Sequence, residues 1–118
     1  MVTFVGAEYI IANVLIALKR RKNRATISLS ELNEFGIYIK KMSIERDLDA
    51  VFLVSQDQLN LALFDFSDYF EYIESGKIIC INKNKQIIDL ASRFVGYLPW
   101  DVLAFLVETT DEYAKQSA

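Results

Sequence analysis

The pattern of hydrophobic and polar positions changes several times along the chain, and its first section is the most apolar. Residues 7–22 are rich in helix-favouring residues and are apolar on nearly every face between Tyr9 and Leu18. A helix that is apolar all round must be covered on all sides. In a chain of 118 residues, this pattern predicts a helix that lies at the centre of the domain or in a subunit interface.

The next section predicts a short strand followed by helical structure. Residues 25–28 favour a strand, and Ser28 with Glu31 has the S-x-x-E spacing of a capping box that opens a helix. Hydrophobic residues then recur at helical spacing at Leu29, Leu32, Phe35, Ile39 and Met42. Gly36 interrupts this pattern, so we expect a turn there and either one helix or two.

Residues 49–66 allow two interpretations. Two strand-favouring runs flank the polar residues 56–58, and the alternation that follows residue 58 predicts a β-hairpin. The competing interpretation is one helix that begins with a capping box at Ser55 and Gln58. Its hydrophobic positions are Leu59, Leu63, Phe66 and Phe70.

The remaining sections predict helices around one clear strand. Residues 67–75 are expected to form a short helix that Gly76 ends. Residues 77–82 are apolar on both faces, which is typical of a central strand. A further helix follows residue 83, and Pro99 is placed as the first residue of a final helix. The apolar face of that final helix is expected to comprise Trp100, Leu103, Leu106 and Val107.

Together these elements predict a single α+β domain over residues 1–118, with helices packed on a short, mostly antiparallel sheet. The composition agrees, because 53% of the residues are hydrophobic and the chain has only 4 Gly and 1 Pro. Residues 2–18 resemble a membrane span in apolarity, but they are short for one and contain Glu8 and Asn13. We therefore expect a cytoplasmic protein without membrane association.

The charge is unevenly distributed. Residues 1–24 carry five cations and one anion, a net charge of +4, whereas the remainder carries eight cations and fifteen anions, a net charge of −7. The acidic part repels phosphate backbones and favours a basic protein partner. The basic run 19–24 follows the apolar helix, where exposed carbonyl groups favour cations. It either only ends the helix or also binds an acidic partner or DNA.

The residue types present exclude much of enzyme chemistry. The chain has no histidine and a single cysteine, Cys80, so it lacks the Ser-His-Asp and Cys-His arrangements and the usual zinc ligands. No phosphate-binding glycine motif is present, and we predict no cofactor. Cys80 lies in an apolar strand and is interpreted as a small core residue rather than a reactive thiol.

Carboxylates gather between residues 44 and 75, where Arg46 is the only cation. Asp47 and Asp49 have the spacing of a pair that can bind Mg²⁺ through oxygen ligands. A metal-dependent enzyme is therefore one alternative. The other interpretation of the same residues is a solvated acidic face.

Residues 28–51 weakly resemble the helix-turn-helix part of winged-helix regulators. The points of similarity are the capped first helix, Gly36 at the turn and the segment IERDL, which is similar to the end of a recognition helix. When the predicted strand before it and the predicted hairpin after it are included, the resemblance covers about half the chain. It implies DNA binding through the major groove by Lys40, Lys41 and Arg46, with Arg20 and Arg21 of the basic run on a neighbouring backbone.

Two features depart from that pattern. The spacing from Gly36 to Asp47 is long, and the segment SQDQ, where the wing would lie, carries Asp57 instead of a cation. Both departures weaken the prediction of DNA binding, because wing and recognition helix need positive charge to hold phosphates.

Acidic and aromatic residues are interleaved at Asp68, Tyr69, Glu71 and Tyr72, a composition that suits either a core or a protein interface. The leading hypothesis is a non-catalytic interaction protein of a kind found in bacteria: an immunity protein, antitoxin, inhibitor or assembly adaptor. It predicts a protein partner and a homodimer. DNA binding and metal-dependent catalysis are the two alternatives.

Overall fold

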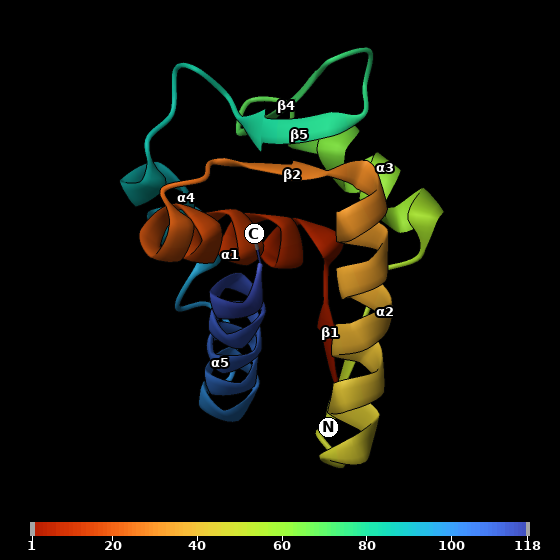
Figure 1. The fold of residues 1–118 in the computed structure, drawn as a ribbon. Coiled ribbons are helices and arrows are strands. Elements are labelled where there is room, and N and C mark those ends of the chain that lie inside the picture. Colours follow the sequence, from red (N-terminus) through yellow and green to blue (C-terminus); the bar gives the residue numbers. More distant parts are fainter. Residues whose placement is uncertain (1, 118) are drawn as a thin grey trace.

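The centre of the molecule is the first helix, α1 (Ala7–Lys22), as Figure 1 shows. The structure is a computed structural model that describes residues 2–117. Every side chain of α1 from Ile10 to Leu18 is buried except the half-buried Ile16. This confirms the predicted all-round apolar helix. The chain itself covers the helix, so its burial requires no second subunit.

Two small sheets lie on different sides of α1. β2 (Thr26–Ser28), β5 (Ile78–Ile81) and β4 (Phe70–Ile73) form an antiparallel sheet in that order, with β5 in the centre as predicted. β1 (Thr3–Val5) and β3 (Ala50–Phe52) pair in parallel, which the sequence pattern did not predict. In Figure 1 the antiparallel sheet lies above α1 and β1 runs below it.

Helix α2 (Leu29–Glu45) is continuous, so of the two predicted alternatives the single helix is confirmed and the turn at Gly36 is wrong. The capping box of Ser28 and Glu31 opens the helix as expected. Gly36 serves close packing instead of a turn, because a Cβ atom there would lie 3.1 Å from Cβ of Val54. The predicted helix-turn-helix arrangement is therefore absent from residues 28–51.

Helix α3 (Gln56–Asp65) replaces the predicted hairpin, which was wrong. The capping box that Ser55 and Gln58 form decides this local structure, and Leu59 and Leu63 are buried one turn apart. The same segment would have supplied the wing of a winged-helix domain. A helix stands in its place.

Residues 67–75 do not form the predicted helix; they form a turn and strand β4. The pairing of β4 with the apolar strand β5 outweighs the local helical tendency. Glu74, Ser75 and Gly76 all have positive φ, so Gly76 belongs to a tight hairpin turn instead of a helix end.

Two helices complete the fold: α4 (Ile87–Phe94) and α5 (Trp100–Gln116). Pro99 stands at the N-cap, so α5 begins at Trp100, one residue after the predicted start. Leu106 is fully buried in the predicted face, but Trp100 is 81% exposed, whereas Val102 of the same turn is buried. α5 packs along α1, and α4 packs against α1 from another side.

The fold is that of an α+β domain, as predicted. Its radius of gyration of 13.1 Å agrees with the roughly 13.5 Å expected for one compact domain of this length. Phe94 lies at the centre of an aromatic cluster with Tyr9, Phe66, Tyr69 and Phe70. None of the helices described in residues 2–117 has the length and apolarity needed to cross a membrane.

Candidate interaction surfaces

Helix α3 exposes two large hydrophobic side chains. Leu61 and Phe64 are three residues apart and are 58% and 78% exposed. The opposite side of the helix holds Leu59, Ala62 and Leu63, which are buried. The helix therefore completes the core with one face and presents an apolar strip with the other.

Hollows flank this strip on both sides. One hollow of about 480 Å³ lies between α3 and β4, with Phe64, Ser67 and Tyr72 among its lining residues. A second hollow of about 280 Å³ lies between α3 and the start of α1, and Leu61 and Asp65 line it. We refer to Leu61, Phe64, Asp65, Asp68 and Tyr72 as the α3–β4 surface.

The four residues predicted for an interface are only partly brought together. Asp68 is exposed in the turn before β4, and Tyr72 is exposed at the rim of the larger hollow, with its hydroxyl group 3.4 Å from Oδ1 of Asn60. Tyr69 packs inward against Phe94. Glu71 pairs with Cys80 in the β4–β5 register, so its side chain alternates with that of Tyr72, yet both residues line the larger hollow.

The chain around this surface is uniformly acidic. Residues 47–76 contain seven carboxylates and no cation. These carboxylates are Asp47, Asp49, Asp57, Asp65, Asp68, Glu71 and Glu74. Asp57, Asp65 and Asp68 are exposed, and none of the three forms an ion pair within the described part of the chain. The segment that carries the surface is therefore acidic, although Lys85 and Arg93 from outside it lie over the rings of Tyr69 and Phe66.

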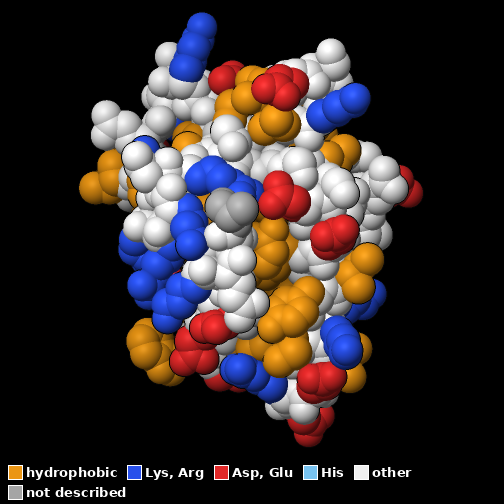
Figure 2. All heavy atoms as spheres, in the orientation of Figure 1, with side chains coloured by type: hydrophobic (Ala, Val, Ile, Leu, Met, Phe, Trp, Pro, Cys, Tyr) orange, Lys and Arg blue, Asp and Glu red, His pale blue; other side chains and the backbone are white. Residues whose placement is uncertain are grey.

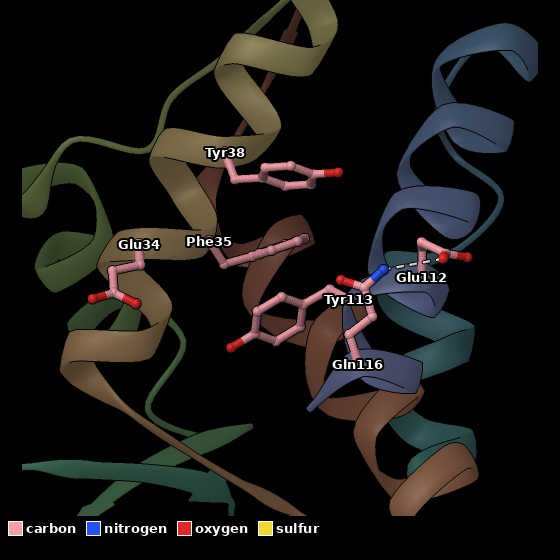
Figure 3. A pocket seen from close by; sticks show the side chains of 6 residues that line it. All are labelled: Glu34, Phe35, Tyr38, Glu112, Tyr113 and Gln116. Carbon is pink, nitrogen blue, oxygen red and sulfur yellow. Dashed lines mark hydrogen bonds between the residues drawn. The ribbon is translucent and has the colours of Figure 1, made fainter. Parts of the chain in front are cut away.

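A second candidate surface is the groove between α2 and α5. Figure 2 shows hydrophobic side chains in this groove, in the middle of the face toward the viewer. Its first compartment, about 250 Å³, is drawn in Figure 3, where Phe35 and Tyr38 project from α2 toward Tyr113 of α5. A second compartment of about 380 Å³ adjoins it and shares Tyr38 and Glu112. Sequence periodicity did not predict this groove, because it depends on how far the two helices splay apart.

The basic residues proposed for nucleic-acid contact occupy separate places. Arg20 and Arg21 both bind Asp111 of α5, at 2.9 Å and 2.7 Å. Arg46 lies 3.6 Å from Glu108 and above the ring of Phe105. Lys40 and Lys41 are exposed on α2. Three of these five cations are therefore already paired with carboxylates of α5.

The candidate chemical groups give little support to catalysis. Burial, together with the neighbouring charge of Glu71, raises the pKa of Cys80, and a raised pKa makes a thiol less reactive. Asp47 and Asp49 are exposed. Within residues 2–117, no three His, Cys, Asp or Glu side chains are grouped so that they could hold a metal ion.

Comparisons with protein-family models, with curated proteins and with solved structures found no match to this chain. The structure defines the fold class of the protein: it is an α+β domain built around a central helix. Its function has to be inferred from its own surfaces.

Proposed function

We propose that this protein is a non-catalytic interaction protein, of the inhibitor, immunity, antitoxin or adaptor type, which binds a basic protein partner through the α3–β4 surface. The observation that supports this most directly is the coincidence of exposed Leu61 and Phe64 with the acidic section 47–76. Protein interfaces commonly have an apolar centre with a polar rim. The chemistry of this surface fits that arrangement.

The charge of the surface indicates the kind of partner. Carboxylates around an apolar strip attract a partner that offers cations around its own apolar residues, and they repel nucleic acids. Contact between two α3–β4 surfaces would bring like charges together. The predicted homodimer would therefore have to use another surface, and the α3–β4 surface is better suited to a different protein.

A pair of matched double variants tests this proposal. Leu61→Ser with Phe64→Ser removes the apolar strip, whereas Ile37→Ser with Ile44→Ser makes the same kind of change on exposed residues of α2. We expect a partner captured by the natural protein to bind the α3 variant at least about tenfold more weakly once purified, and to bind the α2 variant normally. The binding should also weaken as salt increases.

Circular dichroism shows whether both variants are folded, and light scattering after size-exclusion chromatography gives the oligomeric state. Equal binding by the two variants would contradict the role of the α3–β4 surface. The DNA-binding alternative makes a different prediction. It requires salt-dependent DNA binding that Lys40→Glu with Lys41→Glu abolishes and that the α3 variant leaves unchanged.

A further inference from the structure

The first compartment of the α2–α5 groove has an unusual combination of walls. Three aromatic rings line it: Phe35 is buried at its base, Tyr38 is 43% exposed at its rim, and Tyr113 faces them from α5. The ring centroids of Phe35 and Tyr113 are 4.7 Å apart, and those of Phe35 and Tyr38 are 6.4 Å apart. The three rings therefore pack against one another, and because Phe35 is only 1% exposed, Tyr38 and Tyr113 supply the accessible part of this aromatic wall.

Two carboxylates flank these rings. Glu34 of α2 and Glu112 of α5 are among the residues that line the pocket, and Figure 3 shows their carboxylates on opposite outer sides of the three rings, not pointing at them. Neither forms an ion pair within the described residues; Glu112 only accepts a hydrogen bond of 3.2 Å from Nε2 of Gln116. No lysine or arginine is among the residues that line this compartment. Its negative charges are therefore available to a cation from outside.

The adjoining compartment differs in this respect. Arg46 and Lys115 line it, and each lies next to a carboxylate, Glu108 at 3.6 Å and Asp111 at 3.8 Å. Of the two unpaired carboxylates, Glu112 lines both compartments and Glu34 lines the aromatic compartment alone. The pKa of Tyr113 is raised, chiefly by burial; the charges of Glu31 and Glu34 add to the rise, and Ser117 and the charge of Arg24 oppose it.

We propose that the compartment bounded by Phe35, Tyr38, Tyr113, Glu34 and Glu112 binds an alkylammonium group. Ring faces carry negative charge density and attract alkylated ammonium ions, and aromatic pockets recognise these groups in many proteins. Carboxylates at the rim add charge attraction. With about 250 Å³, the compartment is smaller than the roughly 300–1,000 Å³ typical of drug-sized ligands, so one side-chain-sized cation suits it.

The ligand chemistry is shared by two sources: a free small cation, or a lysine side chain, methylated or not, on a partner protein. The site is separate from the α3–β4 surface, because none of its residues belongs to that surface. The two proposals are therefore tested independently. A negative result for partner binding at the α3–β4 surface does not affect cation binding in this compartment, and a negative result for cation binding does not affect the α3–β4 surface.

The first experiment compares choline with its uncharged isostere 3,3-dimethylbutan-1-ol at equal ionic strength. Amide chemical shifts of the protein follow the titration of each compound. We expect choline to shift the amides of residues 34–38 and 112–116 in a saturable manner, and the isostere to bind about tenfold more weakly. Equal binding of the two compounds, binding elsewhere or no binding of choline would overturn the proposal.

Variants locate the binding. Tyr38→Leu removes an exposed ring, and Glu112→Gln removes a charge; each should weaken choline binding severalfold. The matched controls are Tyr97→Leu and Glu45→Gln, an exposed tyrosine and an exposed glutamate that do not line the pocket, and these should bind choline as the natural protein does. A loss that is equal in the controls would contradict the assignment.

A third titration identifies the source of the cation. The probes are blocked lysine and blocked trimethyllysine, each as an N-acetyl methylamide. Tighter binding of either than of choline supports a partner's side chain, and tighter binding of choline supports a free small cation. Both results require shifts at the same amides, and shifts at other residues would count against the site.

Discussion

Asp111 explains, at the scale of one residue, what the basic run of the chain does. Its carboxylate accepts hydrogen bonds from Arg20 and Arg21, and Lys115 lies 3.8 Å away. Hydrogen bonds from the arginines, that of Arg21 first, hold the pKa of Asp111 far below its ordinary value of 3.8. The run therefore joins the end of α1 to α5, a role that no pattern within residues 19–24 indicates.

Replacing Asp111 by asparagine tests this connection. Because both guanidinium groups are largely exposed, we expect the free energy of unfolding at pH 7 to fall by only about 1 kcal/mol. The folded-state pKa is lowered, so the difference from the natural protein is present above the ordinary pKa and disappears as the pH falls toward the folded-state pKa.

Urea denaturation from pH 7 to well below the ordinary pKa of 3.8 measures this effect, with Asp68→Asn as the control. Asp68 is exposed and lacks an ion pair in the described residues, so its replacement should have little effect. A pH-independent loss for the Asp111 variant would show that its charge is not the cause.

At the scale of helices and strands, the sequence predicted correctly those elements whose hydrophobic pattern and end signals favour the same structure. α1, β5 and α5 have strong hydrophobic patterns and clear ends, and the structure contains all three. In residues 59–64 every second residue is leucine, as on one face of a strand, yet Leu59 and Leu63 are also one helical turn apart. The capping box at Ser55 and Gln58 and packing against α1 both favour the helix.

Sequence reasoning predicted even less of the candidate sites. Of the proposed interface, Asp68 and Tyr72 lie on the α3–β4 surface, but the sequence did not single out Leu61 and Phe64 for an interface. The aromatic compartment joins residues 34–38 to residues 112–116, which are far apart in the chain. No sequence pattern indicates this compartment, because it exists only where α2 and α5 face each other in the fold.

The close packing of Gly36 leads to a prediction about the stability of helix α2. Alanine is the better helix former by about 0.5–1 kcal/mol, but at this position its Cβ would lie 3.1 Å from Cβ and 3.3 Å from the carbonyl oxygen of Val54. Because Val54 is buried, we expect Gly36→Ala to lower the free energy of unfolding by about 1 kcal/mol.

Thermal denaturation of Gly36→Ala and Gly36→Val measures this crowding. The valine variant should be the less stable, since it is bulkier and a poorer helix former. Ser30→Ala, at an exposed position of the same helix, is the control and should cause no comparable loss. If Gly36→Ala stabilised the protein as much as helix propensity alone predicts, Val54 would leave room for the added Cβ atom. The crowding explanation would then be wrong.

At the scale of the whole molecule, the core is organised around one helix. Both sheets, α4 and α5 cover α1, and the aromatic cluster of Phe94 closes one end. Asn13, the one buried polar side chain of α1, bonds to the carbonyl oxygens of Tyr9 and Phe94. The surface around this core separates charge, with cations at the end of α1 and carboxylates along residues 47–76.

Because the core is organised around α1, replacing isoleucine by alanine should change stability very differently at a buried and at an exposed position. Ile11 in α1 is fully buried, and Ile44 in α2 is 72% exposed. We expect Ile11→Ala to lower the free energy of unfolding by about 2–5 kcal/mol and Ile44→Ala to change it by less than about 0.5 kcal/mol. Urea denaturation of the two variants measures the difference. Losses of similar size would show that α1 is not the centre of the core.

The position of α1 in the chain has a consequence for protein synthesis. The ribosome makes this helix before α4 and α5, which cover it and begin only at Ile87 and Trp100. Until α5 has been made, the growing chain exposes its most apolar helix, a situation in which chaperones and aggregation compete. The yield of folded protein should therefore depend on how rapidly α5 docks once it has emerged from the ribosome.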